Sequence, residues 1–484
     1  ERWDFVEDFF LGSDVDIYSN GSIIIDSNAM VVMNDSKKFW VHNNGSAIFG
    51  GTETKPARIK CFSGYYQFEV SSNGNISSVH TIFENMGFDG LEIAGNILQS
   101  GTFDFCTFKN GMPGGSLLTF SNMQPITING AVFPENTWGS NYNVTKINSE
   151  GPVHFEGAIG NFAGSQFHDD PNNTVTWENT QYFHNLSLES GWSSLSSWVI
   201  PEGETLETIF ESILSNLIIA ATMDGIYYPA QNINTIGNWE SHDAFMIKMA
   251  DAGTLSLLAP PETNNIVELN EGWTLMPVVS PIPVNSDELF SGINWALQIV
   301  KEVAGTKVFW PEVGIYTLDN IEPGKAYLIR CSDLVDLLFE PFPPEGWMKK
   351  TINENELEEN IFHPWNKVIA SNYTHTIGFP QEITNLFNDG DVIGVFTPEG
   401  QCAGVAAVQP DQPFALTAFA DDPITAEIEG FATGEPLTFK KYAPDLKEET
   451  TIKVIFDQEL PDAEGVFTPD GLSVVKEVLL EPEN

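Results

Sequence analysis

A short repeat runs through residues 1–180 and restricts the folds open to this part of the chain. The corner Asn20-Gly21-Ser22 returns as Asn44-Gly45-Ser46, one period later. Short apolar clusters such as Ile23-Ile24-Ile25 lie between such corners, a pattern typical of strands separated by turn residues. Three short strands in each period predict a parallel β-helix over residues 1–180, with coils stacked about 4.8 Å apart.

Aromatic residues follow nearly the same period. The sequence Thr81-Ile82-Phe83-Glu84-Asn85 is echoed one period later by Cys106-Thr107-Phe108-Lys109-Asn110, and Phe133 follows after one more. We therefore expect Phe83, Phe108 and Phe133 to form one internal stack, and about seven coils to fit before residue 180. A β-sandwich is the competing interpretation, since it also has short strands and frequent turns. It does not predict the same corner tripeptide at a one-coil interval.

Net charge limits the partners of the chain. Aspartate and glutamate number 67 against 21 lysines and arginines, which gives a formal net charge of −46. Such an excess repels phosphate backbones and anionic membranes, so we expect no nucleic-acid partner and no membrane insertion. The excess of acidic residues is consistent with a protein surface that stays soluble at high salt or binds divalent cations. Because 42% of the residues are apolar, the chain is expected to fold around hydrophobic cores.

The sequence shows no established catalytic motif. Four cysteines, at 61, 106, 331 and 402, are too few and too scattered for a disulfide scaffold, and Cys402 is expected to be a small buried residue. Two coils would place Cys61 and Cys106 about 9–10 Å apart, which is beyond disulfide reach. The eight histidines are spread singly, and none has the spacing of zinc ligands. No nucleophile elbow, P-loop or dinucleotide fingerprint is present.

Residues 181–340 are predicted to form a duplicated α+β module, with copies over about 191–250 and 272–331. Gly191-Trp192 answers Gly272-Trp273, and the strand-like residues 244–248 answer 326–330, each with an exposed basic end. Apolar residues at helical spacing over 206–217 and 289–297 predict one helix in each copy. In the second copy, Ser286-Asp287-Glu288 is expected to cap the helix.

A proline-rich stretch over residues 341–346 is predicted to be a linker. Residues 347–484 follow it with several strand-like runs. Gly394-Val395-Phe396-Thr397-Pro398-Glu399-Gly400 recurs as Gly465-Val466-Phe467-Thr468-Pro469-Asp470-Gly471, and each copy is expected to be a strand that ends in a hairpin turn. These features predict an antiparallel β-sandwich. The expected fold class is therefore mainly β: a right-handed parallel β-helix, a duplicated α+β domain and a C-terminal sandwich.

Two parts of the chain resemble known families. The repeat of residues 1–180 resembles the right-handed β-helix domains of secreted bacterial proteins, which include pectate lyases, polygalacturonases, adhesins and surface stalks. Gly390-Asp391-Val392-Ile393-Gly394-Val395-Phe396 and the run over 416–423 resemble a module of large secreted proteins of Bacteroidetes, and the doubled unit before it resembles its usual neighbour. This second resemblance covers about residues 185–475. It implies export by the type IX route to the cell surface or the extracellular space, and it implies no reaction.

Candidate binding residues are of two kinds. Aromatic rings at equivalent positions of the doubled unit could stack on sugar rings, although a duplicated fold also keeps such residues for packing; they are Trp192, Tyr228, Trp273 and Trp310. Carboxylates that lie close together could hold Ca²⁺ through their oxygens, although solvated turns use the same pairs; they are Asp169, Asp170, Asp389, Asp391, Asp421 and Asp422. No catalytic residue and no cofactor other than Ca²⁺ is predicted.

The sequence favours a non-catalytic extracellular protein with a structural or adhesive role, which could assemble into filaments. The first coil begins close to Glu1, so we expect this end to meet a preceding segment or another copy. The alternative is a protein that binds or cleaves polysaccharide in a groove of the β-helix, as a polysaccharide lyase or a glycoside hydrolase. The expected partners are cell-surface components, polysaccharide or other copies of the chain.

Overall fold

The computed structural model describes residues 2–5, 8–97, 101–134, 142–201, 203–343, 361–460 and 462–480. The protein is mainly β, with 47% of its residues in strands and 5% in helices. It divides into two compact units: Glu1–Phe183 with Leu258–Pro261, and His184–Leu257 with Glu262–Asn484. Part of the predicted linker (344–346) and the start of the predicted sandwich (347–360) lie outside the described residues. Among the described helices, none is long and apolar enough to cross a membrane.

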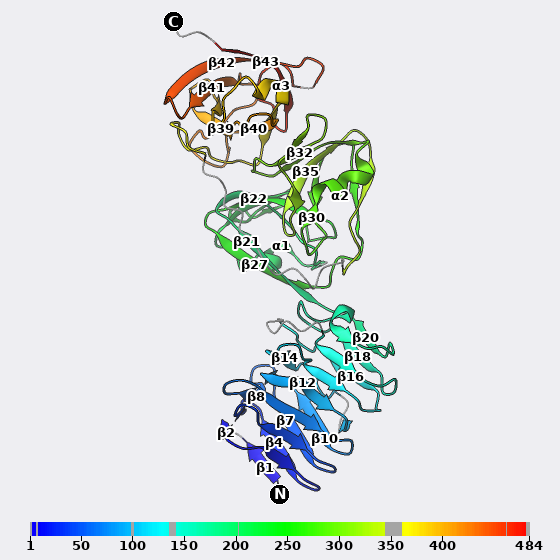
Figure 1. The fold of residues 1–484 in the computed structure, drawn as a ribbon. Coiled ribbons are helices and arrows are strands. Elements are labelled where there is room, and N and C mark those ends of the chain that lie inside the picture. The colour runs from blue at the N-terminus through cyan, green and yellow to red at the C-terminus, as the bar shows by residue number, and fades with distance from the viewer. Residues whose placement is uncertain are drawn as a thin grey trace. The chain divides into compact units, whose positions relative to one another are not determined.

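The first unit is a β-solenoid of about six turns, coloured blue to cyan in Figure 1. Its strands stack turn on turn into parallel sheets. The first sheet contains β1 (Arg2–Phe5), β4 (Ser22–Asp26), β7 (Ser46–Gly50), β10 (Asn75–Val79) and β13 (Asn96–Ile97). The second contains β2 (Phe9–Leu11), β5 (Met30–Met33), β8 (Ala57–Cys61), β11 (Thr81–Glu84) and β14 (Thr107–Lys109).

Two further parallel sheets complete the solenoid. The third sheet contains β3 (Val15–Ile17), β6 (Lys38–Val41), β9 (Tyr66–Val70), β12 (Met86–Ile93), β15 (Leu118–Phe120), β17 (Val144–Lys146) and β19 (His168–Asp169). The fourth contains β16 (Ile126–Asn129), β18 (Val153–Glu156) and β20 (Val175–Glu178). A short 3-10 helix, η1 (Ser165–Phe167), precedes β19.

The corner tripeptide sets the register between neighbouring coils. Ser22 pairs with Ser46, so the predicted period is confirmed at this corner. Asn20 and Asn44 both adopt the left-handed conformation, and the Asn20 amide donates to the Asn44 carbonyl of the next coil at 3.0 Å. A Cβ at Gly45 would lie 2.2 Å from the Ile17 carbonyl oxygen, which explains why glycine recurs at this corner.

The period is less regular than the sequence suggests. One coil advances the chain from Arg2 to its partner Ser22, whereas a later coil makes the longer step from Ser46 to Asn75. Much of this variation falls in the corners, because paired strands tend to keep their register. The longer coils reduce the number of turns to about six, so the expectation of seven was too high.

The aromatic stack is confirmed inside the solenoid. Phe83 pairs in register with Phe108, and their rings are parallel within 4° at 5.5 Å between centroids. Phe108 in turn stacks on Phe133 at 5.6 Å. All three side chains are fully buried. In-register stacking of identical side chains thus connects successive coils through the core.

The second unit begins with two five-stranded antiparallel sheets of identical strand order, drawn in green tones in Figure 1. The order in one is β22 (Gly191–Ser196), β26 (Ala244–Met249), β23 (Leu217–Ala221), β24 (Ile226–Tyr228) and β25 (Ile233–Asn234). In the other it is β29 (Gly272–Pro277), β35 (Ala326–Cys331), β31 (Leu297–Glu302), β32 (Val308–Trp310) and β33 (Ile315–Tyr316).

The helices of this region are much shorter than predicted. They are α1 (Leu206–Ile209) and α2 (Ser286–Phe290), followed by turns, and Leu217 and Leu297 already begin β23 and β31. After α1 the amides of Ile213 and Asn216 bond three residues back, so the helix tightens into turns while its apolar spacing continues. The cap of α2 is Asn285, whose side chain accepts from the Glu288 amide at 3.2 Å, one residue before the predicted start.

The basic strand ends are not exposed as predicted. Every residue of β26 is buried, and Lys248 is only 8% exposed, because this strand lies between β22 and β23 with both faces covered. The equivalent Arg330 on β35 is partly buried. A central strand that is covered on both faces consists mostly of consecutive apolar residues. Basic residues in such a strand, here Lys248 and Arg330, need polar partners.

Smaller elements complete this region. They are β21 (Tyr182–Leu188), β27 (Gly253–Ala259), β28 (Ile266–Leu269) paired with β36 (Val335–Leu338), β30 (Val284–Asn285) paired with β34 (Asn320–Ile321), and the 3-10 helices η2 (Pro229–Gln231) and η3 (Ser291–Ile293).

The C-terminal region forms a seven-stranded sheet with a separate hydrophobic core. Its order is β39 (Cys402–Ala407), β38 (Val392–Phe396), β41 (Thr438–Ala443), β42 (Glu448–Phe456), β43 (Leu472–Leu480), β37 (Thr374–Phe379) and β40 (Phe414–Phe419), with α3 (Gln381–Thr384) after β37. The sheet is mixed, since β37 pairs with β43 in parallel.

The two copies of the predicted hairpin turn differ. In the first copy β38 and β39 form an antiparallel hairpin, as predicted, and the Gly400 amide closes its turn by donating to the Thr397 carbonyl at 2.9 Å. In the second copy the Gly471 amide closes the same turn on Thr468. There Val466 makes only an isolated bridge to Pro436, so the strand expected before the turn is absent from the described residues.

Candidate functional site

The aromatic residues predicted to bind sugars take part in packing. Trp310 is 2% exposed and lies in a hydrophobic cluster with Leu472 and Val474 of β43. Trp273 is partly buried against the same cluster, and Tyr228 is partly buried at the end of β24. A ring stacks on a sugar only if one of its faces is open to solvent. Trp310 therefore offers no sugar platform.

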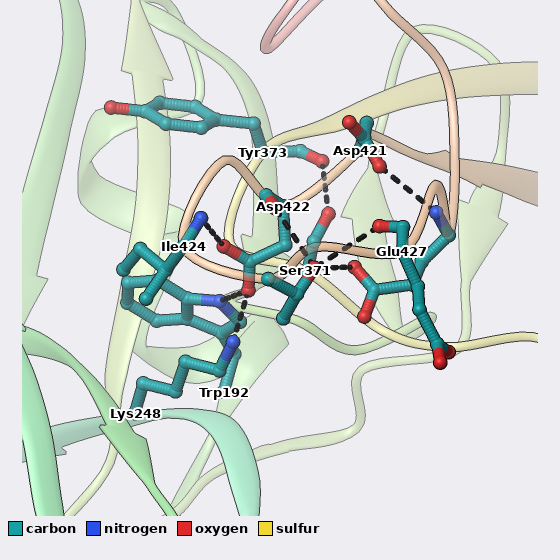
Figure 2. A network of polar contacts seen from close by, with 10 residues as sticks. Trp192, Lys248, Ser371, Tyr373, Asp421, Asp422, Ile424 and Glu427 are labelled. Atoms are coloured by element: carbon teal, nitrogen blue, oxygen red, sulfur yellow. Dashed lines mark hydrogen bonds and ion pairs between the residues drawn. The ribbon is translucent and has the colours of Figure 1, made fainter.

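Trp192 belongs to a polar network around Asp422, shown in Figure 2. The Trp192 indole N–H donates to Asp422 Oδ2 at 2.6 Å, and Lys248 Nζ contacts the same oxygen at 2.5 Å. The other carboxylate oxygen accepts from the Ile424 amide at 3.0 Å. Burial alone would raise the pKa of Asp422, but the hydrogen bonds from Lys248, Ile424 and Trp192 hold it below its ordinary value.

The second sheet has a comparable arrangement around Trp273. Lys301 Nζ lies 4.6 Å from the centroid of the Trp273 ring. The same ammonium donates to Thr374 Oγ1 and to Asp470 Oδ1, both at 2.8 Å. Burial lowers the pKa of Lys301, and Asp470 opposes that shift. In both networks a buried lysine bonds a carboxylate of the C-terminal region, Asp422 in the first and Asp470 in the second, so these networks join parts of the second unit.

The carboxylates predicted to bind Ca²⁺ are not brought together. Asp170 is buried and stabilises its own turn, because it accepts from the amides of Asn172 and Val175 at 3.3 and 2.7 Å, while Asp169 is exposed on β19. Asp391 accepts from the Asn388 amide at 2.9 Å and lies 3.4 Å from Lys441 Nζ, while Asp389 is exposed. Asp421 accepts from the Glu429 amide at 2.9 Å. These oxygens are occupied by internal donors.

A different set of residues forms a groove on the outer face of the third solenoid sheet. The groove encloses about 550 Å³ and crosses β6, β9 and β12. The floor is made by the side chains that point outward from these strands, among them Lys38, Gln67, Glu69 and Glu92. Their neighbours Phe39, Phe68 and Leu91 point inward and are buried. Strand alternation thus places polar groups in the groove and apolar groups in the core.

A bulge in β12 builds one wall of the groove. The pairing of β12 with β9 shifts between Met86 and Leu91, so the segment between them protrudes from the sheet. Gly90 has a φ of +61°, and a Cβ there would lie 2.2 Å from the Leu117 carbonyl oxygen, so the bulge requires glycine. The bulge presents Phe88, whose side chain is 57% exposed, together with Asp89, while Tyr65 and Met112 also line the groove.

The floor of the groove carries a stacked pair of carboxylates with one lysine. Glu69 and Glu92 are direct partners on β9 and β12, and Lys38 Nζ forms an ion pair with Glu69. Lys38 also lies 3.8 Å from the centroid of the Trp40 ring, which helps to fix its position. Burial, then the charges of Glu69 and Asp89, raise the pKa of Glu92 against the opposing effect of Lys38. Glu92 is therefore suited to hold a proton.

A second hollow lies on the outer face of the second sheet and encloses about 490 Å³. Its lining is largely apolar and includes Ile82, Val132 and Ile159 from successive coils. Phe105, 50% exposed, stacks on His80 at 4.8 Å between ring centroids beside it. Its polar side chains, Thr52, Glu53, His80 and Thr107, are fewer than those of the groove, so the hollow is the less suited of the two for a polar ligand.

Sequence reasoning missed the groove residues for a physical reason. The predicted carboxylate pairs are close in the sequence, whereas Glu69 and Glu92 meet through strand pairing and lie a whole coil apart in the sequence. The sequence feature that points to such pairs is the coil period, since residues one coil apart lie side by side on neighbouring strands. The bulge in β12 shifts that alignment, so the period alone would not have paired these two residues.

Comparison of the chain with family models, with curated proteins and with solved structures finds no match. The geometry of the described residues therefore carries the functional argument.

Proposed function

We propose that this protein is an extracellular adhesive protein that binds a neutral polysaccharide in the groove of its solenoid. The observation that carries the proposal is that the exposed Phe88 lines the same groove as three hydrogen-bonding groups, Glu69, Glu92 and Lys38. Sugar rings have an apolar face of C–H groups and an edge of hydroxyl groups. The groove offers a ring for the first, and carboxylate acceptors and an ammonium donor for the second.

The charge of the groove favours a neutral ligand. Four carboxylates line it, at Asp35, Glu69, Asp89 and Glu92, against the single ammonium of Lys38. An acidic polysaccharide would be repelled by this excess and by the net charge of the whole chain, −46. The groove runs across three adjacent coils, so a linear chain of sugars could lie along it.

Binding is tested with a panel of neutral and acidic polysaccharides by isothermal titration calorimetry. We expect a neutral member to bind and Phe88→Ala to weaken it by at least about tenfold, which corresponds to about 1.4 kcal/mol. Phe62→Ala is the matched control, since Phe62 is 70% exposed on the same solenoid and lines neither hollow. Failure of every neutral polysaccharide to bind would overturn the assignment. So would weaker binding in Phe105→Ala together with unchanged binding in Phe88→Ala.

Cleavage of the bound polysaccharide is the second candidate function. It is favoured by the raised pKa of Glu92 beside Glu69, because a glycosidase needs one protonated and one ionised carboxyl group. The same incubations are assayed for new reducing ends. Release that is abolished by Glu92→Gln and kept by Asp169→Asn supports cleavage, whereas binding without release excludes it.

We extend the proposal to the fold of the second unit, the handedness of the solenoid, the export of the protein and its assembly. Identical strand orders support a duplicated α+β module in the second unit, and the hairpin of β38 and β39 supports a C-terminal sandwich. A right-handed solenoid and export by the type IX route rest on the resemblances given above. Assembly of copies into filaments is supported by β1, β2 and β3, which form edges of the solenoid sheets within the described part of the chain.

A further inference from the structure

The fourth solenoid sheet brings together a histidine and two glutamates that neither the proposed groove nor the core uses. His154 and Glu156 lie on β18, two positions apart, so both side chains point to the outer face while Val153 and Phe155 point inward. Glu178 on β20 is the direct partner of Glu156. One ligand atom from each of the three residues lies within 4.8 Å of the other two.

We propose that His154, Glu156 and Glu178 form a binding site for a divalent transition-metal ion such as Zn²⁺. The distance from His154 Nε2 to Glu156 Oε2 is 3.4 Å. Two ligands of a tetrahedral zinc ion, each about 2.1 Å from the metal, lie about 3.4 Å apart. The pair therefore already has the spacing that zinc requires, and Glu178 supplies a third ligand from the next strand.

Two residues of the neighbouring coil orient the ligand atoms. His154 Nδ1 lies 2.9 Å from Thr176 Oγ1, which leaves Nε2 facing Glu156. The Asn179 side-chain amide donates to Glu156 Oε1 at 2.6 Å, which leaves Oε2 for a metal. Outer-shell partners of this kind fix the orientation of metal ligands, and their loss typically lowers affinity about 10–100-fold.

Charge gives a second and independent reason for a cation at this position. Carboxylates stacked directly on adjacent strands repel one another. In the stacked pair of the groove, Glu69 and Glu92, a lysine offsets the repulsion, because Lys38 forms an ion pair with Glu69. Within the described residues, neither Glu156 nor Glu178 forms an ion pair with a lysine or an arginine. The strand partner of Glu156 on the preceding coil is Asn129, whose side-chain amide donates to Asp104 at 2.9 Å.

The imidazole of His154 indicates which class of metal ion the site would bind. Ca²⁺ and Mg²⁺ take oxygen ligands, whereas a histidine nitrogen with two carboxylates suits zinc and its neighbours in the first transition row. Three protein ligands leave a fourth tetrahedral position open to water. The side chains are partly or fully exposed, so an ion can enter from solvent.

The test is titration of the chelator-treated full chain with Zn²⁺ alone, and in parallel with Ca²⁺ alone, by isothermal titration calorimetry. We expect one equivalent of Zn²⁺ to bind and Ca²⁺ to bind more weakly. Glu178→Gln and His154→Gln should each weaken Zn²⁺ binding by at least tenfold, and Thr176→Val by about 10–100-fold through lost orientation. Circular dichroism of each variant verifies that it is folded.

The matched control is Glu84→Gln, which removes an outward-pointing glutamate of the same solenoid that lies near Lys109. It should bind Zn²⁺ like the parent protein. Equal Zn²⁺ affinity in the parent, His154→Gln and Glu178→Gln proteins would overturn the proposal. Ca²⁺ affinity equal to that for Zn²⁺ and indifferent to His154→Gln would also overturn it. Neither result depends on whether a polysaccharide binds in the groove.

Discussion

At the scale of single residues, Asp422 shows why a pair of aspartates in a loop is a poor guide to a metal site. Its two oxygens are taken by Lys248, Trp192 and the Ile424 amide. A metal ion at this position would have to displace an ammonium group already held in a buried ion pair. The contacts of Asp422 therefore point to a role in stability.

The stability of the second unit should depend strongly on Asp422. We predict that Asp422→Ala lowers the free energy of unfolding by about 3–5 kcal/mol, because it leaves Lys248 as a buried charge without its partner. Chemical denaturation of the full chain measures the change. The adjacent Asp421 is the control: it accepts from the Glu429 amide, and Asp421→Ala should lower stability by about 1 kcal/mol. Equal losses in the two variants would contradict this account.

At the scale of elements, the stack of Phe83, Phe108 and Phe133 connects three successive coils of the solenoid. We predict that Phe108→Ala lowers the free energy of unfolding of the solenoid by about 3–5 kcal/mol, since it opens a cavity between two rings that cannot approach each other. Phe108→Leu keeps most of the volume and should lower it by about 1.5 kcal/mol or less. Phe10→Ala removes a ring that is 70% exposed and is the control. A solenoid transition that is insensitive to Phe108→Ala would show that the stack does not hold the coils together.

The elements also show what could be predicted from the sequence. Corners and stacked rings recur at nearly even spacing because each coil repeats the same local geometry, so the solenoid and the Phe108 stack could be predicted. The helix of residues 206–217 was overestimated because apolar residues of turns and of β23 happened to continue the helical spacing. The burial of Lys248 could not be foreseen, since it depends on which strands flank β26.

The groove and the proposed site of His154, Glu156 and Glu178 were equally hard to predict from the sequence. Glu69 meets Glu92, and Glu156 meets Glu178, only through the register of strands on neighbouring coils. Motifs defined by linear spacing therefore contain neither pair. His154 stands alone by zinc-ligand spacing for this reason, although Glu156, two positions later, shares its face of the strand.

At the scale of the whole molecule, buried histidines make stability depend on pH. His375 is fully buried, and the Thr468 amide donates to its Nδ1 at 3.1 Å while Nε2 lies 2.8 Å from Ser473 Oγ. Since Nδ1 accepts, the ring is held neutral with its proton on Nε2. Burial lowers the pKa of His375 to about 4, with Lys301 adding to the shift and Asp462 opposing it. Burial also lowers the pKa of His184 to about 4.

The second unit should therefore lose stability in two separate ranges of pH. Between pH 6.5 and about 4 the unfolded chain takes up protons on these two histidines and the folded chain does not, so the free energy of unfolding falls by about 3 kcal/mol for each. The pKa of Asp422 is shifted below its ordinary value of 3.8, so its contribution to stability is lost only at lower pH, as the folded carboxylate takes up its proton.

Denaturation at a series of pH values measures the loss of stability in both ranges. His375→Gln should reduce the slope in the upper range and leave the lower range, while Asp422→Asn should reduce the loss in the lower range, to which Glu449 also contributes because its pKa is lowered as well. A free energy of unfolding that stays constant from pH 6.5 to 4 would contradict the neutral state assigned to the buried rings.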